Sequence, residues 1–226
     1  MISLKILLED MLAITTVIPF TLGTALLILV CGIFLGLLVA LIRLFRVPVL
    51  NQIVFVYMQY TRGIPLIIHL YIAYYLLPRI LNNITGNAPV GGADPMIVLI
   101  AAYSLYAAVG QSENIRGAFL SIEKGQWDAA YASGLTAAQT LRRVVFPQGL
   151  SLAIPAFFNQ YLGIIKGLSL AFTIGVTDIL ARAKLASAVN FYYLEAYLSA
   201  ALVYWGLCVA LTFIFNKLEL RFRKWE

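Results

Sequence analysis

Long runs of hydrophobic residues separated by short polar stretches dominate the chain. A helix that crosses a membrane needs about 20 predominantly apolar residues, and residues 11–42 contain no charged side chain. The pattern predicts an all-α membrane protein with five transmembrane helices, at about residues 16–42, 62–81, 96–114, 149–166 and 193–216. A further apolar stretch, residues 49–60, is interrupted by amides, and we interpret it as a helix packed at the interface or against other spans.

Two segments between these runs have a different pattern. Residues 78–95 are rich in Asn, Gly and Pro, which predicts an exposed loop. Residues 167–184 are apolar but contain Gly167, Gly175 and Asp178. For this second segment the pattern leaves open a half-buried hairpin or a re-entrant piece.

Composition supports a membrane protein. The 226 residues are 62% hydrophobic and 12% charged, whereas soluble domains have about 45–50% apolar and about 25% charged residues. The net charge of +6 does not indicate a nucleic-acid partner, because the basic residues are scattered at the ends of apolar runs. Cys31 and Cys208 lie inside apolar runs and are interpreted as small packed residues. Charged residues precede the first long apolar run, so we expect no cleaved signal peptide.

Residues 113–148 form the longest water-compatible segment, and they predict helix, turn, helix. Residues 126–133 are rich in alanine, which favours a helix. Asp128 is expected in its first turn, where a negative charge suits the helix dipole. Gly134 is expected to end the helix.

A second helix is predicted to begin at Thr136, because Thr136 and Gln139 have capping-box spacing. Arg142 and Arg143 are then expected in the last turn of this helix. Pro147 is predicted to prevent its simple continuation.

This segment resembles the signature loop of permease subunits of ATP-binding-cassette (ABC) importers. The family pattern E-A-A, three residues, G, nine residues, I-x-L-P occurs here as Asp128-Ala129-Ala130, Gly134 and Val144-Val145-Phe146-Pro147. The resemblance implies a type I ABC importer permease fold, with cytoplasmic coupling helices at residues 118–146 that dock into a separate ATPase. The implied coupling residues are Gly125, Asp128, Ala129, Ala130, Gly134 and Pro147.

A second resemblance concerns the run Thr61 to Leu66, which is similar to the R-G-T-P-L run of polar amino acid permeases, with Ile64 in place of Thr. Arg62 has two open interpretations: an anchor that reaches the membrane interface, or a residue of a gate or subunit contact. Gly63 and Pro65 interrupt the helix locally, so a moving element could use them as a hinge.

Polar residues within the predicted spans are candidates for the substrate path, because ionisable groups at membrane depth usually face the bundle interior or a wet path. Glu113, in a run similar to the family's A-E-I-x-R-G, either pairs with Arg116 or faces the path. Lys166 and Ser169 lie in I-K-G-L-S-L, which resembles the family's L-K-D-T-S-L, and Lys166 either lines the path or anchors at the outer interface. Asn159 and Gln160 are amides in the same apolar helix, and His69 is either a packed histidine or a substrate ligand.

The sequence contains no catalytic constellation and no phosphate-binding loop, since Gly is never followed by Lys. We therefore expect no cofactor in this chain and no enzyme activity of its own, with ATP and Mg bound by a partner ATPase. Because five spans alternate in direction, the 43–48 turn, the helix–turn–helix segment and the tail lie on one side of the membrane. That side has ten Lys and Arg residues, and the other side has four. This asymmetry predicts an external N-terminus and a cytoplasmic C-terminus.

Taken together, the resemblance implies the permease subunit of an ATP-driven importer for polar amino acids in the bacterial inner membrane. Residues 178–188 and 194–205 look similar to cystine permeases. The implied partners are two ATPase subunits, a second permease copy or a close relative, an external substrate-binding protein, an amino acid and the lipid bilayer. A secondary transporter driven by an ion gradient is the alternative, although the chain shows no internal repeat.

Overall fold

The computed structural model describes residues 2–85 and 94–222, and every regular element within those ranges is helical. In chain order the elements are α1 (Leu4–Thr15), α2 (Ile18–Leu44), α3 (Leu50–Gly63), α4 (Leu66–Thr85), α5 (Pro95–Leu120), α6 (Lys124–Ala132), α7 (Ala137–Thr140), the π-helical turn η1 (Leu141–Val145), α8 (Phe146–Gly167), the 3₁₀ helix η2 (Leu168–Ile174), α9 (Ile179–Asn190) and α10 (Tyr193–Phe222). The all-α prediction is confirmed for the described ranges.

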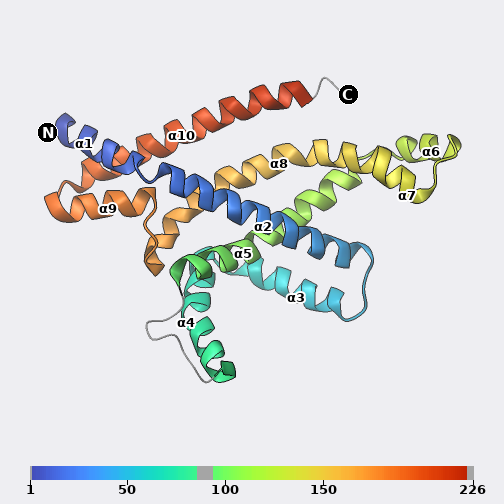
Figure 1. Ribbon diagram of the computed structural model, residues 1–226, viewed down its shortest axis with the longest axis horizontal. Helices are drawn as coiled ribbons and strands as arrows, with labels where there is room; N and C mark the ends of the chain where they lie inside the picture. The colour runs from blue at the N-terminus through green and yellow to red at the C-terminus, as the bar shows by residue number, and fades with distance from the viewer. Residues whose placement is uncertain (1, 86–93, 223–226) are drawn as a thin grey trace.

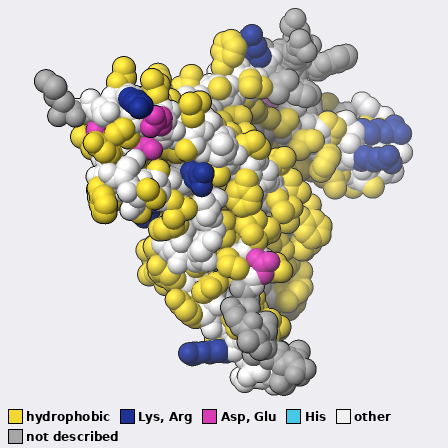
Figure 2. Space-filling model, turned by 60° about the vertical axis from the view of Figure 1, so that its left-hand side comes forward, with side chains coloured by type: hydrophobic (Ala, Val, Ile, Leu, Met, Phe, Trp, Pro, Cys, Tyr) yellow, Lys and Arg dark blue, Asp and Glu magenta, His cyan; other side chains and the backbone are white. Residues whose placement is uncertain are grey.

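Three long helices, α2, α5 and α8, cross in the middle of the molecule (Figure 1). At one end α1 packs with α9 and the start of α10, and at the other end α5 leads into α6 and α7. Helix α4 projects away from the rest of the chain. The surface that Figure 2 shows is mostly hydrophobic, with few charged side chains, as a chain surrounded by lipid requires.

The closest helix contact is between α2 and α5, and two glycines permit it. Gly32 and Gly36 lie one turn apart on α2 and face α5. A Cβ atom added to Gly36 would lie 2.7 Å from the Gln111 Cβ and 2.9 Å from the Ala108 carbonyl oxygen. Helices in lipid associate through such close backbone approach, since no hydrophobic effect drives their contact. This G-x-x-x-G pair was not predicted, although the motif is visible in the apolar run.

Among the residues that the structure describes, three helices are long and apolar enough to cross a membrane, and two bent helix pairs bring the number of candidate spans to five. The three are Ile18–Leu44, Pro95–Leu120 and Tyr193–Lys217, which match the first, third and fifth predicted spans. The bent pairs are Leu50–Gly63 with Leu66–Ile84, at 115°, and Ala137–Ile174 with Ile179–Asn190, at 48°. The structure therefore has three to five candidate spans in its described ranges, and the third extends six residues beyond its predicted end.

The helix of the second predicted span begins at Leu66, four residues after the start expected near Arg62. Ile64 has an extended backbone, with φ −122° and ψ 131°, so α3 ends at Gly63 and α4 begins only at Leu66. The residue before a proline is sterically disfavoured in a helix, and Pro65 follows Ile64. The predicted helix over residues 49–60 is confirmed as α3.

The loop predicted at residues 78–95 is partly wrong, because α4 continues through Pro78 to Thr85. Membrane helices tolerate such internal prolines where neighbouring groups satisfy the freed backbone. Residues 86–93 lie outside the described ranges. At the far end of this segment Asp94 caps α5, since its Oδ1 accepts a hydrogen bond of 2.7 Å from the Met96 N–H.

The ambiguous segment after residue 167 is a 3₁₀ helix, a break and a short α-helix. Gly175, at φ +91°, ends η2 in the left-handed region. Asp178, which is buried, then caps α9 by accepting from the Ala181 N–H at 2.9 Å. Its other oxygen accepts from the Tyr204 hydroxyl at 2.7 Å, so one carboxylate joins α9 to α10.

The N-terminal helix α1 was not foreseen, because its charged residues obscured an apolar face. Asp10 is 5% exposed, and its Oδ2 atom has no hydrogen-bond partner among the described residues. The neighbouring Glu195, 6% exposed, accepts from the Ser3 N–H at 3.1 Å. Burial raises the pKa of Asp10, and the charges of Glu9 and Glu195 raise it further.

We therefore expect Asp10→Asn to raise the free energy of unfolding at neutral pH. The folded chain binds a proton at Asp10 more tightly than the unfolded chain does. The contribution of Asp10 to the stability of the wild-type chain is therefore greatest below the pKa that Asp10 has in the unfolded chain, and it is lost as the pH rises through the pKa that Asp10 has in the folded chain. The gain from Asp10→Asn should thus shrink as the pH is lowered from 7 toward 4. Thermal unfolding in detergent across this range tests the expectation, and Glu123→Gln, on an exposed side chain of the segment between α5 and α6, is the control. An equal gain at every pH would contradict it.

Candidate functional site

The segment after α5 folds as the predicted helix, turn and helix, with two adjustments. Helix α6 begins at Lys124, two residues earlier than expected, so Asp128 lies in its second turn rather than its first. The stop at Gly134 is confirmed, with φ +78°. The Leu135 N–H bonds the Ala130 carbonyl at 3.2 Å and the Gly134 N–H bonds the Tyr131 carbonyl at 2.9 Å, which is the Schellman pattern of a helix end.

The second predicted helix starts as expected and continues only through an irregular turn. Thr136 and Gln139 form the reciprocal capping box, in which the Gln139 Oε1 accepts a hydrogen bond of 2.9 Å from the Thr136 N–H. The helix does not continue simply through Pro147, as predicted: it passes from α7 through the π-helical turn η1 into α8. In η1 the Phe146 N–H bonds the Leu141 carbonyl, five residues back. We attribute the continuation to this wider turn, which relieves the clash that a proline ring makes in an α-helix.

Helix α6 is held against the rest of the chain by its inner face. Ala130 is 6% exposed, and the Gln126 Oε1 accepts a hydrogen bond of 3.1 Å from Gln148 at the start of α8. Gly125, Asp128 and Ala129 are exposed on the outer face. Of the predicted coupling residues, these three and Gly134 and Pro147 are accessible, whereas Ala130 is packed inside the chain.

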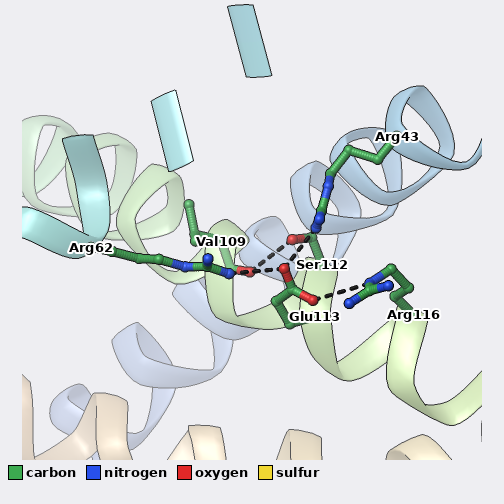
Figure 3. A network of polar contacts seen from close by, with 6 residues as sticks. All are labelled: Arg43, Arg62, Val109, Ser112, Glu113 and Arg116. Atoms are coloured by element: carbon green, nitrogen blue, oxygen red, sulfur yellow. Dashed lines mark hydrogen bonds and ion pairs between the residues drawn. The ribbon is translucent and has the colours of Figure 1, made fainter. Parts of the chain in front are cut away.

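The second part of the site is an arginine cluster, which we define as Arg43, Arg62 and Arg116 around Glu113 (Figure 3). Glu113 Oε1 accepts from Arg43 at 2.6 Å and from Arg62 at 2.8 Å, and Oε2 accepts from Arg116 at 3.1 Å. The pairing of Glu113 with Arg116 is thus confirmed. The bonds to Arg43 and Arg62 were missed, because residues 70 and 51 positions away show no spacing signal.

The arginine cluster joins three helices at one carboxylate. Arg43 lies in the last turn of α2, Arg62 lies directly before the α3–α4 break, and Glu113 lies on α5, which leads into α6. Arg43 and Arg62 share one oxygen, so their charges lie within roughly 5 Å and repel by a few kcal/mol before solvent screening. One carboxylate neutralises only one of the three guanidinium groups.

Helix α5 also contacts other residues predicted to line a path. The His69 ring packs edge-on against Tyr106, at 5.2 Å between centroids, and against Tyr60, at 4.9 Å. The His69 Nδ1 lies 3.2 Å from the Pro65 carbonyl oxygen, and its Nε2 is buried without a partner among the described residues. Gln160 of α8 packs against Gly110, one turn before Glu113.

The remaining candidates on α8 are not gathered into this group. Lys166 and Asn159 are exposed, and Lys166 makes no ion pair with any residue that the structure describes. Ser169 is half-buried in η2. Beside Lys166, Gly167 faces Tyr103, whose Cζ lies 3.0 Å from the position of an added Cβ and whose hydroxyl is closer still. The Tyr103 hydroxyl fills the space where the family pattern has an aspartate side chain.

Known proteins share both the sequence and the fold of this chain. Residues 32–224 match the family model described as "Binding-protein-dependent transport system inner membrane component". The chain belongs to this family. It is an ABC importer permease, and permeases of this kind have no ATPase site of their own.

The relatives of this permease have names that refer to amino acid transport. It is 37% identical to "Probable amino-acid ABC transporter permease protein PatM" of Vibrio harveyi, over 81% of this chain and 80% of that protein. It is 35% identical to "L-cystine transport system permease protein TcyL" of Bacillus subtilis, over 93% and 87%. It is 30% identical to "Glutamine transport system permease protein GlnP" of Escherichia coli, over 90% of each.

Two solved structures share the fold of this permease. "Crystal structure of an amino acid ABC transporter with histidines" matches with a TM-score of 0.84 at 22% identity, over 98% of this chain and 99% of that one. A structure of the MetNI methionine ABC transporter in inward facing conformations matches with a TM-score of 0.68 at 17% identity, over the same shares. The type I ABC importer permease fold is therefore present.

Proposed function

We propose that this permease carries polar amino acids, cystine among the candidates, across the bacterial inner membrane in an ATP-driven importer. The observation that carries the proposal is the exposed outer face of α6 in a chain of this family. Gly125, Asp128 and Ala129 have short side chains and are exposed, while Ala130 and Gln126 fix the helix to the body. Such a surface suits docking into a cleft of a separate ATPase.

The proposed arrangement places the N-terminus outside and the C-terminus and α6 in the cytoplasm. The excess of basic residues on the α6 side supports this orientation. Two ATPase subunits, a second permease and an external binding protein complete the assembly. The projecting helix α4 supports a second permease copy, since Tyr75, Leu76 and Ile84 on it are exposed without cover from this chain.

The proposed mechanism moves α6 and the α3–α4 break together. ATP binding draws two ATPase subunits together, and each carries a docked α6. Because α6 follows α5, and Glu113 of α5 holds Arg62, the displacement reaches the break at Gly63 and Pro65. ATP can shift this equilibrium only by its higher affinity for the closed ATPase pair. The amino acid passes along the α5 side of the bundle, past His69 and Gln160.

Reconstituted vesicles separate this proposal from the ion-gradient alternative. The permease is incorporated with an ATPase subunit and a substrate-binding protein of an amino acid ABC importer, and uptake of labelled cystine and glutamine is followed. We expect uptake to require ATP on the ATPase side and to survive an ionophore that collapses all gradients. Uptake without nucleotide that the ionophore abolishes would overturn the proposal in favour of a secondary transporter.

A further inference from the structure

The arginine cluster has more positive charge than the chain itself neutralises. Within the described residues Glu113 is the only carboxylate bonded to Arg43, Arg62 and Arg116, which leaves two uncompensated positive charges. Each guanidinium has five N–H donors, and Glu113 takes one from each arginine. The side chains of Arg62 and Arg116 are half exposed, so the unused donors are accessible to a ligand.

The cluster lies near the ends of two candidate spans rather than at their centres. Arg43 is in the last turn of α2, and Arg116 is four residues before the end of α5. This height corresponds to the boundary between hydrocarbon and headgroups, on the side where α5 leads into α6. Beside it, the turn from α2 to α3 exposes Leu44, Phe45 and Val49, each about 70% accessible. Charged donors and exposed apolar side chains thus adjoin one another at one membrane face.

A phosphodiester anion fits this combination. The planar guanidinium group binds phosphate oxygens in pairs, and basic pockets between membrane helices bind anionic lipid headgroups. A free phosphate would satisfy the donors and leave Leu44 and Phe45 without a role, whereas a lipid places its acyl chains against them. A bound anion would also reduce the repulsion between Arg43 and Arg62 at Glu113 Oε1.

We propose that the arginine cluster binds the phosphate of an anionic phospholipid in the leaflet on the α6 side. The bound lipid ties α2, α3 and α5 together beside the α3–α4 break. This site lies outside the outer face of α6 and is independent of any substrate. The test of the lipid site therefore does not depend on transport. A negative result for lipid binding would leave the proposed transport function untouched, and a negative result for transport would leave the lipid site untouched.

Lipid retention by the full-length chain tests the site. The chain is extracted from nanodiscs that contain equal parts of phosphatidylglycerol and phosphatidylcholine with the same acyl chains, and native mass spectrometry counts the retained lipids. We expect wild-type chain to retain phosphatidylglycerol selectively, and Arg62→Gln to lower that retention about fivefold, the factor for one basic residue near an anionic surface. Arg142→Gln, on an exposed arginine near α6, removes the same charge as the matched control and should retain wild-type levels.

Two further measurements distinguish a lipid site from general charge attraction and from a site for free phosphate. Glu113→Gln removes the competing carboxylate, so retention of phosphatidylglycerol should hold or rise. Equal losses in Arg62→Gln and Arg142→Gln would mean general surface attraction and would overturn the site, as would a loss in Glu113→Gln that matches Arg62→Gln. Inorganic phosphate in excess should not displace the lipid; if it does, the cluster binds free phosphate and the lipid proposal is wrong.

Discussion

Arginine in place of Ala129 is expected to abolish ATP-driven uptake while the chain remains folded in the membrane. Ala129 lies on the exposed outer face of α6, so the change disturbs no contact within the chain. In a docked complex it would bury an unpaired charge, which costs about 2–5 kcal/mol at an interface. That range corresponds to a loss in ATPase affinity of roughly 30-fold to several thousandfold.

The measurement is co-purification of the ATPase with tagged permease, together with amino acid uptake. Ala138→Arg is the matched control, because Ala138 is an exposed alanine in the neighbouring helix α7, outside the proposed docking residues. Normal ATPase binding and uptake in Ala129→Arg would refute the docking role of α6. Ala130 is unsuitable for this test, since it is buried and an arginine there would disrupt the fold itself.

The largest loss of stability is expected from Gly36→Ala. The added methyl group would lie 2.7 Å from the Gln111 Cβ and 2.9 Å from a backbone oxygen of α5, so the helices must move apart. Overpacking of this kind typically costs about 1–3 kcal/mol, and Gly36→Leu should prevent the helix pair from forming. Thermal unfolding of the purified chain in detergent, followed by fluorescence, measures the loss.

Gly23→Ala on the same helix is the control. Apart from its chain neighbours and the adjacent backbone of α2, no described atom lies within 4 Å of a Cβ added at Gly23, and the residue is exposed. Alanine is a better helix former than glycine by about 1 kcal/mol, so the melting temperature should hold or rise slightly. Equal destabilisation by the two changes would show that glycine content, rather than close helix contact, controls the stability of α2.

The hydrophobic pattern predicted the membrane-spanning helices well because the physical requirement for such a helix is local in the sequence. A span must satisfy its own backbone groups and cover them with apolar side chains, so residues 18–44 and 193–217 can be recognised without their neighbours. Capping at Thr136 and the stop at Gly134 are local in the same sense. The irregularity predicted at Pro147 is local as well, but its form, a π-turn through which the helix continues, is signalled by no residue type.

The candidate site was predictable in part for the same reason. Glu113 and Arg116 are three residues apart, and their pairing follows from helix geometry. Arg43 and Arg62 reach the same carboxylate from α2 and α3, and the bend of 115° between α3 and α4 determines where Arg62 lies. Crossing angles depend on packing between distant segments, so contacts of this kind cannot be inferred from one sequence.

The contact between Tyr103 and Gly167 constrains how the chain can diverge. An aspartate introduced after Lys166, as in the family pattern, would meet the Tyr103 hydroxyl, so the tyrosine side chain would have to shift. Phenylalanine at position 103 removes that oxygen and leaves the ring Cζ at 3.0 Å from the added Cβ, which a smaller shift relieves. The effect of a substitution at position 167 therefore depends on the residue at position 103, which is epistasis between two helices that are distant in the sequence.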